Sequence, residues 1–261
     1  MPATLSAHRP NPLGFLPVWQ RNFLVWRKMA IPAILGNLAD PLIYMLGLGY
    51  GLGAMLPSID GRPYVAFLAA GTVCASTMNA ATFEALYSAF SRMHVQKTWE
   101  AILNTPLGLA DVVAGELFWA ATKSLFSGAA ILVVITGMGL THGPLALWAL
   151  PAIVLTGLAF AALGLIWNAL APSYDFFMYY FTLFITPMLL VSGVFFPADQ
   201  LPAVVHALAS WLPLAHAVGL ARPLLLGQVP ENALMHVSAL LAIALVAFYI
   251  ASALTRRRLL K

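Results

Sequence analysis

Charged side chains inside long apolar segments are the residues of this sequence that could do chemistry. Glu116, Lys123 and Ser127 follow one another at intervals of seven and four residues, so they share one face of a helix. Asp40 stands alone in an earlier apolar segment. Ionised groups at membrane depth are costly, so they either pair within the protein or line a polar route for a substrate or an ion. Pairing of Lys123 with Glu116 or a neighbouring carboxylate is the simpler interpretation, and a substrate route is the alternative.

Aromatic residues concentrate between residues 174 and 196, where Tyr179 and Tyr180 are adjacent. Tyrosines near the end of a membrane helix are typical of the interface with water. They could also form a hydrogen-bonding wall for a substrate that carries sugar or lipid. Both tyrosines are therefore candidates for a substrate path.

The motifs of nucleotide binding, acyl transfer and metal binding are absent from the sequence. No G-x-x-x-x-G-K-[ST] loop occurs, because Lys123-Ser124 is preceded by Thr122 where glycine is required. No G-x-S-x-G or H-E-x-x-H motif occurs either, and a single cysteine cannot build a cysteine-based metal cluster. We expect no catalytic, cofactor-binding or metal-binding residue in this chain.

The amino-acid composition indicates whether the protein folds in water or in a membrane. Of 261 residues, 61% are apolar and 8% are charged, and the mean hydropathy is +0.87. A soluble domain carries about 25% charged residues. This excludes a soluble enzyme, a nucleic-acid-binding domain and a disordered chain, and it predicts an all-α membrane protein with one domain over residues 1–261.

Six apolar segments have about the 20 residues that a membrane crossing needs. Residues 124–174 carry no charge and are too long for one crossing, and the glycines and proline between residues 136 and 144 predict a turn there. The predicted spans are residues 30–54, 64–87, 110–137, 145–170, 175–196 and 232–254, with a loop at 88–107.

Residues 200–221 are also uncharged and long enough to cross, but Pro202 and Pro213 interrupt them. With six spans, ten of the thirteen lysines and arginines share one side, opposite Arg62 and Arg222, and the positive-inside rule favours that arrangement over seven spans. We therefore expect an outer re-entrant helical hairpin over 197–226, broken near Pro213. Both termini are then cytoplasmic.

The stretch 13–28 is amphipathic. Phe15, Trp19, Phe23 and Trp26 fall within one helical sector, which is typical of a helix that lies in the headgroup plane. A plain anchor before the first span and a mechanical role explain these residues about equally well.

A short helix is predicted in the cytoplasmic loop. Thr98 can cap it, and it ends before Pro106. Trp99, Ile102 and Leu103 share one of its faces. This face could float at the membrane interface, or it could insert into a groove on a soluble partner.

Two blocks of sequence resemble the type 2 ABC-transporter permease family, and within it the membrane subunits of lipo-oligosaccharide exporters. The first block is KTWEAILNTPL at 97–107. The second comprises VSGVFFP at 191–197, QLP at 200–202, PLAHA at 213–217 and ARPL at 221–224. The resemblance extends from about residue 12 to 255, and family members have six helices, an amphipathic N-terminal helix and an outer re-entrant hairpin.

The resemblance implies a permease that works with separate subunits. Two copies of the chain would pair with two copies of an ABC ATPase, which would hold the ATP and Mg²⁺. Residues 97–105 resemble the coupling helix that docks on that ATPase, with Thr98, Trp99, Glu100, Ile102 and Leu103 as its contact residues. The cargo would be amphipathic: a lipo-oligosaccharide, glycolipid, polysaccharide or drug. Membrane lipid is a further partner, and nucleic acid is not. A stand-alone ion-coupled transporter or channel is the alternative.

Overall fold

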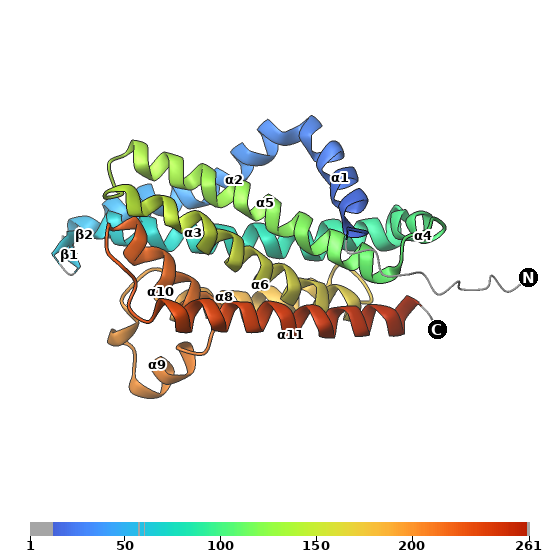
Figure 1. Ribbon diagram of the computed structural model, residues 1–261. Helices are drawn as coiled ribbons and strands as arrows, with labels where there is room; N and C mark the ends of the chain where they lie inside the picture. The colour runs from blue at the N-terminus through green and yellow to red at the C-terminus, as the bar shows by residue number, and fades with distance from the viewer. Residues whose placement is uncertain (1–12, 57, 60, 260–261) are drawn as a thin grey trace, which may run out of the picture.

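A computed structural model describes residues 13–56, 58–59 and 61–259, and of Asp40 it describes only the backbone. The predicted substrate-path role of the Asp40 side chain therefore lies outside the described residues. Within them all regular secondary structure is helical apart from one two-stranded sheet, as the composition predicts (Figure 1). The chain is an all-α membrane protein.

The first helical segment bends twice. α1 (Phe15–Trp26) leads through a 3₁₀ turn at Arg27–Met29 into α2 (Ala30–Tyr44), which continues through a π-helical turn at Met45–Tyr50 and ends in a 3₁₀ turn at Leu52–Ala54. Figure 1 shows α1 lying across the long axis of the bundle and α2 running along it. The strands β1 (Ser58–Ile59) and β2 (Arg62–Pro63) then form an antiparallel ribbon in which Ser58 is opposite Pro63.

The second helix is longer than the sequence predicts. α3 (Tyr64–Phe83) continues through π-helical turns at Glu84–Ser88 and Ser91–Val95, so the helix runs to Val95. Residues 88–95 therefore belong to the helix and not to a loop. The reason is that Phe90, Arg92 and Met93 are buried against the rest of the protein, which extends the helix past the end of the apolar run.

The short helix α4 (Thr98–Leu103) follows, and two long helices come next, α5 (Leu109–Gly137) and α6 (Ala149–Leu170). Lys97 precedes α4 in the left-handed region at φ 51°, and the side chain of Thr98 does not cap the helix. The predicted Thr98 cap is wrong, because Thr98 is already the first helical residue. A 3₁₀ turn at Pro144–Trp148 leads into α6, after the turn predicted between residues 136 and 144.

The predicted fifth span is shorter than expected. α7 (Phe176–Tyr180), a π-helical turn (Phe181–Ile185) and α8 (Thr186–Val191) make one helical segment, which falls short of the about 20 residues that a full crossing needs. Residues 192–196 are not helical, because the chain turns at Gly193, whose φ of +76° suits glycine. The other five predicted spans correspond to long apolar helices.

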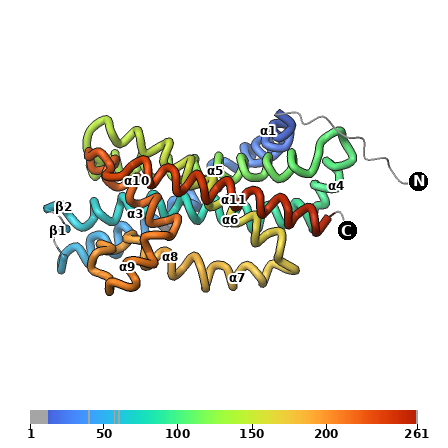
Figure 2. Tube along the Cα trace, turned by 60° about the horizontal axis from the view of Figure 1, so that its bottom comes forward, coloured from blue at the N-terminus to red at the C-terminus, as the bar shows by residue number. Residues whose placement is uncertain are grey.

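Two helices meet at a sharp angle where the hairpin is predicted. α9 (Ala203–Ala209) and α10 (Pro213–Leu225) are bent by 85° at a short break, and Pro213 begins the second helix, close to the predicted break. α10 packs against α3, α6 and α11 (Ala233–Leu259). Figures 1 and 2 place α9, α10 and the β-ribbon at one end of the molecule, which we call the hairpin end.

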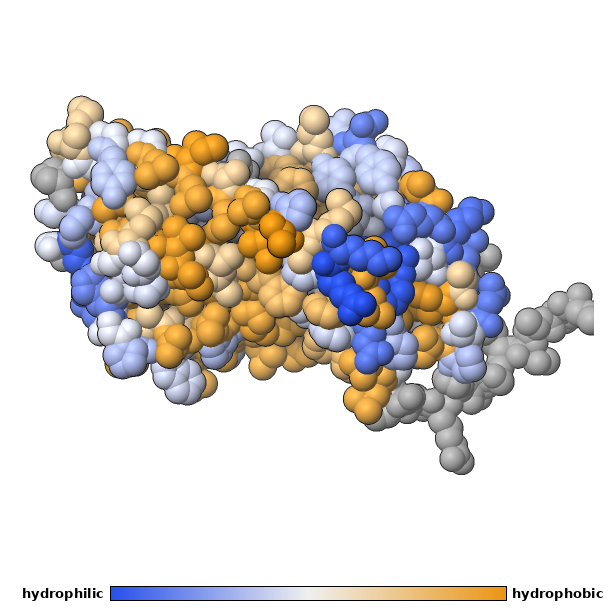
Figure 3. Space-filling view, turned by 90° about the horizontal axis from the view of Figure 1, so that it is seen from above, coloured by the Kyte–Doolittle hydropathy of each residue, from blue (hydrophilic) through white to orange (hydrophobic). Residues whose placement is uncertain are grey.

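The opposite end, which we call the basic end, carries α4, the start of α1 and the end of α11 (Figures 1 and 2). The segments there contain Arg21, Lys97 and the cluster Arg256–Arg258. Between the two ends the molecular surface is apolar. Figure 3 shows a broad hydrophobic band with hydrophilic side chains on both sides of it, as expected for a bundle whose middle faces lipid.

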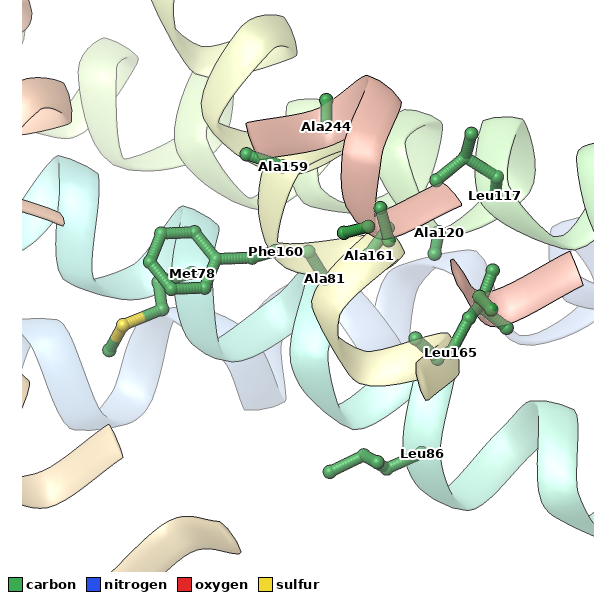
Figure 4. Close-up of a cluster of buried hydrophobic side chains, with 14 of the residues drawn as sticks. Met78, Ala81, Leu86, Leu117, Ala120, Ala159, Phe160, Ala161, Leu165 and Ala244 are labelled. Carbon is green, nitrogen blue, oxygen red and sulfur yellow. The ribbon is translucent and has the colours of Figure 1, made fainter. Parts of the chain in front are cut away.

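The core lies where α3, α5, α6 and α11 pack together, and small side chains let these helices approach closely. Ala81, Ala120, Ala159 and Ala161 all lie in one buried cluster around Phe160 (Figure 4). A Cβ atom at Gly164 would come within 2.8 Å of the Cβ of Ala85. Close contact between small residues is how membrane helices gain van der Waals energy, since lipid chains are as apolar as the core.

Candidate functional site

Three buried charges and one half-buried charge, that of Lys123, form an alternating chain between α5 and the helix that extends α3. The guanidinium of Arg92 lies between two carboxylates, with its Nε 2.9 Å from Oε1 of Glu116 and an Nη 2.8 Å from Oε1 of Glu84. The ammonium of Lys123 is 2.6 Å from Oε2 of Glu84. The order is therefore Glu116, Arg92, Glu84, Lys123, and the four charges sum to zero.

Both carboxylates also accept hydrogen bonds from neutral donors. The indole of Trp99 donates to Oε1 of Glu116 over 3.0 Å, and that of Trp119 donates to Oε1 of Glu84 over 2.7 Å. The amide of Asn22 donates to Oε2 of Glu116 over 3.2 Å. A buried ion pair is tolerable only when its remaining lone pairs are satisfied, and here each carboxylate has at least three donors.

This network decides between the two expected partners of Lys123, Glu116 and a neighbouring carboxylate, in favour of the second. Glu116 shares the face of α5 with Lys123, but it pairs with Arg92, and Lys123 pairs with Glu84 of the neighbouring helix. Ser127, the third residue of the predicted stripe, contacts Ser76 on α3, with the two hydroxyl oxygens 2.9 Å apart. The stripe therefore faces α3 along its whole length.

The docking face predicted for α4 points into the protein. Trp99 is 1% exposed, and Ile102 and Leu103 pack against the main core. Trp99 is held inside the protein, because its indole N–H reaches the buried carboxylate of Glu116, while Ile102 and Leu103 are half-buried. Contact of this short helix with a partner stays a prediction. The exposed residues of this segment are Lys97, Glu100, Ala101, Asn104 and Thr105.

The aromatic face of α1 packs on α5. Trp19 donates a hydrogen bond to the hydroxyl of Thr122 over 3.0 Å. Phe15 contacts Phe118, Phe23 contacts Trp119, and Trp26 stacks on Phe126 with ring centroids 4.9 Å apart. Arg21 reaches across to the hydroxyl of Thr98 over 3.4 Å, so α1 also contacts α4.

The two tyrosines of the predicted substrate path point in different directions. Tyr180 is 3% exposed and packs on Trp167, whereas Tyr179 is 61% exposed on the outer surface. Neither contacts the charge network. The structure therefore brings Glu116 and Lys123 together and leaves Tyr179 and Tyr180 apart from them.

Two cavities meet at Lys123. The first, of about 170 Å³, lies between α2, α3, α5, α8 and the segment after α8, and its polar lining includes Asn37, Ser76, Asn79 and Ser127. The second, also about 170 Å³, lies toward α1 and is lined by Arg21, Asn22, Glu84, Arg92 and Lys123 among others. The ion pair between Lys123 and Glu84 stands between the two.

Comparison with known proteins shows the family to which this chain belongs. The family described as ABC-2 type transporter matches residues 15–226, from α1 to the end of α10. The chain belongs to the ABC-2 type transporter family. It is accordingly the membrane permease subunit of an ABC transporter, and the family implies an ABC ATPase as its partner.

Relatives within the family cover the whole chain. Nodulation protein J of Rhizobium leguminosarum bv. viciae is 53% identical over 99% of both chains. Nodulation protein J of Rhizobium meliloti (strain 1021) is 51% identical over 98% of both. A more distant relative, the inner membrane transport permease YadH of Escherichia coli (strain K12), is 22% identical over 89% of this chain and 90% of its own.

Sequence reasoning missed Glu84 and Arg92, which hold the centre of the network of this ABC-2 permease. Both look like ordinary charges near a membrane boundary when read along the chain. One local signal was available: Phe90 and Met93 flank Arg92 with apolar side chains at helical spacing, which indicates that the helix continues and carries Arg92 with it.

Proposed function

We propose that this permease is the transmembrane half of an ATP-driven exporter, and that ATP is hydrolysed on a separate subunit bound at the basic end. The observation that carries the proposal is the attachment of α4. Trp99 connects this short helix to Glu116 on α5, and Glu116 connects to Arg92 on the extended α3 helix. A partner that moves α4 thereby moves both long helices.

The docking surface of this proposal is the exposed side of α4. It comprises Lys97, Glu100, Ala101 and Asn104, while the Trp99 side anchors the helix from within. The contact of Arg21 with Thr98 and of Asn22 with Glu116 adds α1 to the same moving unit. Closure of an ATP-loaded partner dimer would shift the bundle between two states of access, because the partner binds one of them more tightly.

The remaining parts of the proposal follow from the family. Two permease copies pair with two ATPase copies, which hold ATP and Mg²⁺. The complex lies in a bacterial inner membrane with both permease termini in the cytoplasm, where the excess of lysine and arginine is expected. The cargo is amphipathic: a lipo-oligosaccharide, glycolipid, polysaccharide or drug.

Co-purification with the ATPase encoded by a neighbouring reading frame tests the proposal. Ala101→Arg places a long cation on the exposed side of α4 without touching the core. We expect binding of the ATPase to weaken at least about tenfold, or roughly 1.4 kcal/mol. The matched control is Ala207→Arg, an exposed alanine on the short helix α9 at the hairpin end, which should bind normally.

Two results would contradict the proposal. One is undiminished ATPase binding by the Ala101→Arg variant. The other is uphill transport by vesicles that contain the permease alone, since that would require an energy source within this chain.

A further inference from the structure

Two histidines meet between α10 and α11 at the hairpin end. His216 is the fourth residue of α10 and His236 is the fourth residue of α11, and their Nδ1 atoms are 3.0 Å apart. The two helices pack against each other, and Figures 1 and 2 show both of them at this end. Twenty residues separate the histidines in sequence, so no local motif indicates the pair.

The backbone of α10 leaves room for one of these rings. A Cβ atom at Gly219, one turn after His216, would lie 2.9 Å from both Cε1 and Nε2 of His236. Only a residue without a side chain lets the His236 ring lie this close to the helix. The position of the pair is therefore set by the packing of two helices.

A cavity of about 250 Å³ adjoins the pair, and its lining includes both histidines, His206 of α9 and Ser192. The hydroxyl of Ser192 is buried and has no hydrogen-bond partner in the described part of the chain. Such a group costs free energy unless water or a ligand satisfies it. The cavity is therefore a place where water can reach a group bound between the two rings.

The charges around the pair oppose one another. Arg222 lines the same cavity, six residues after His216, and its guanidinium donates a hydrogen bond to the carbonyl oxygen of Gly193 over 2.6 Å. Glu231 lines a neighbouring cavity together with His236. Among the described residues that line the two cavities, Arg222 and Glu231 carry the full charges, so neither sign dominates at the pair.

The spacing of the two nitrogens fits one metal ion. A divalent transition metal binds histidine nitrogen at about 2.0–2.1 Å, and two such nitrogens lie about 2.9 Å apart at a right angle and about 3.3 Å apart at a tetrahedral angle. The observed 3.0 Å lies between these values. Each ring has to turn about its Cβ–Cγ bond until its lone pair faces the ion, and this torsion is broad for histidine.

The chemistry of the ligands selects the class of ion. Neutral imidazole suits copper, nickel and zinc, whereas Mg²⁺ and Ca²⁺ require several oxygen ligands. In the metal-free pair one ring donates its Nδ1 proton to the other, and on binding this proton moves to Nε2 of the same ring, so neither ring becomes charged. Among the described residues no group of three or more histidines, cysteines and carboxylates could hold an ion, so water completes the coordination.

We infer that His216 and His236 form a two-ligand site for a divalent transition metal of the copper, nickel and zinc class, and that the ion joins α10 to α11 at the hairpin end. The site is separate from the charge network around Glu116, and it does not depend on the proposed export function. The remaining positions around the ion are open to water from the adjoining cavity.

Copper binding to the full-length permease, purified in detergent without a histidine tag, tests the inference. Cu²⁺ is titrated in and its electron paramagnetic resonance spectrum is recorded, because the spectrum counts the imidazole nitrogens bound to the ion. The variants are His216→Asn and His236→Asn. Asparagine keeps a polar atom near the place of Nδ1, and so keeps a hydrogen bond between the helices, but its amide is a poor ligand for Cu²⁺. The matched control is His142→Asn, an exposed histidine whose backbone N–H donates to Leu225 of α10.

We expect one copper ion per chain with two imidazole nitrogens. Each substitution in the pair should weaken its binding at least about tenfold, because the second ligand is no longer held beside the first, and His142→Asn should bind normally. Excess Zn²⁺ should displace the copper, since both ions use the same nitrogens, and Mg²⁺ at the same concentration should not. The thermal unfolding midpoint of each variant without metal shows whether it is folded.

Gly219→Ala tests the position of the ring without removing a ligand. The added methyl group would lie 2.9 Å from the ring of His236, so we expect copper binding to weaken. Gly137→Ala, with no atom within 4 Å of the added Cβ, is the control and should bind normally. This comparison decides the outcome if an asparagine variant does not fold: unchanged binding by Gly219→Ala then overturns the inference.

Three other results overturn the inference. The first is a wild-type chain that gives no copper spectrum with two imidazole nitrogens. The second is a spectrum that both asparagine substitutions leave unchanged, or that His142→Asn weakens equally, since the ion then belongs to an adventitious site on other histidines. The third is displacement of the copper by Mg²⁺ as effectively as by Zn²⁺, which contradicts the class of ion.

Discussion

Glu116 is the residue at which three segments of the chain meet. Its carboxylate accepts hydrogen bonds from Asn22 on α1, Trp99 on α4 and Arg92 on the helix that extends α3. Each donor is separated from Glu116 by many residues in sequence, so the carboxylate holds together parts of the chain that are distant from one another in sequence. A buried charge of this kind is stabilising only while every partner is in place.

Glu116→Gln keeps the size of the side chain and removes its charge. Breaking a buried ion pair leaves the partner uncompensated, so we expect the free energy of unfolding to fall by about 3 kcal/mol. The measurement is the midpoint of thermal unfolding of the purified protein in detergent.

The matched control is Glu100→Gln on α4. Glu100 forms an exposed pair with Lys97 at 3.8 Å, and such a pair contributes less than about 1 kcal/mol. Equal effects of the two substitutions would show that the network around Glu116 does not stabilise the fold.

At the scale of elements, α1 and α4 are attached to α5 by side chains that reach its buried face. The attachment of α1 depends on a close approach at Gly115, where a Cβ would lie 2.5 Å from the Cβ of Val18 and 3.0 Å from the backbone carbonyl oxygen of Phe15. Val18 is 2% exposed beneath this contact. The amphipathic pattern of α1 predicts a helix among the lipid headgroups, and the same helix is also packed against α5.

Gly115→Ala should push α1 away from α5, because the backbone of Phe15 cannot move without the helix. We expect a loss of about 1–3 kcal/mol in the free energy of unfolding, as for other overpacked contacts, measured from the same thermal midpoint. Gly137→Ala, at the other end of α5, has no atom within 4 Å of the added Cβ and should have no such effect. If both variants unfold alike, the close contact with α1 is not a stabilising one.

For the whole molecule, the distribution of basic residues predicts the orientation in the membrane. The basic end contains the segments with Arg21, Lys97 and Arg256–Arg258, and the hairpin end contains those with Arg62 and Arg222. Arg62 donates to the carbonyl of Leu226, and Arg222 donates to that of Gly193, so both are used to hold loops at the hairpin end together.

Single cysteines in a Cys74→Ala background test this orientation. Ser210→Cys, in the exposed break between α9 and α10, should react with a membrane-impermeant maleimide on intact cells. Thr105→Cys, exposed after α4, should react only after the cells are permeabilised, because lysine- and arginine-rich loops stay in the cytoplasm. The reverse pattern would place α4 outside and would contradict ATPase docking there.

The sequence alone determined the class of the protein, the approximate course of its long helices and the break at Pro213. These features depend on hydropathy, segment length and proline, which act on a few neighbouring residues and can be read along the chain. The end of α8 was misjudged because residues 192–196 are as apolar as the helix before them, and only the turn at Gly193 ends it.

Only the tertiary structure decided what the helix faces contact. The stripe of Trp99, Ile102 and Leu103 has the same pattern whether it faces lipid, a partner or the core, and the choice depends on Glu116, which lies on another helix. The pairing of Lys123 with Glu84 joins residues far apart in the chain, and no local spacing selects it over Glu116. Pairings of this kind follow from how the helices pack, because electrostatic contacts depend on distance in space and not on separation in sequence.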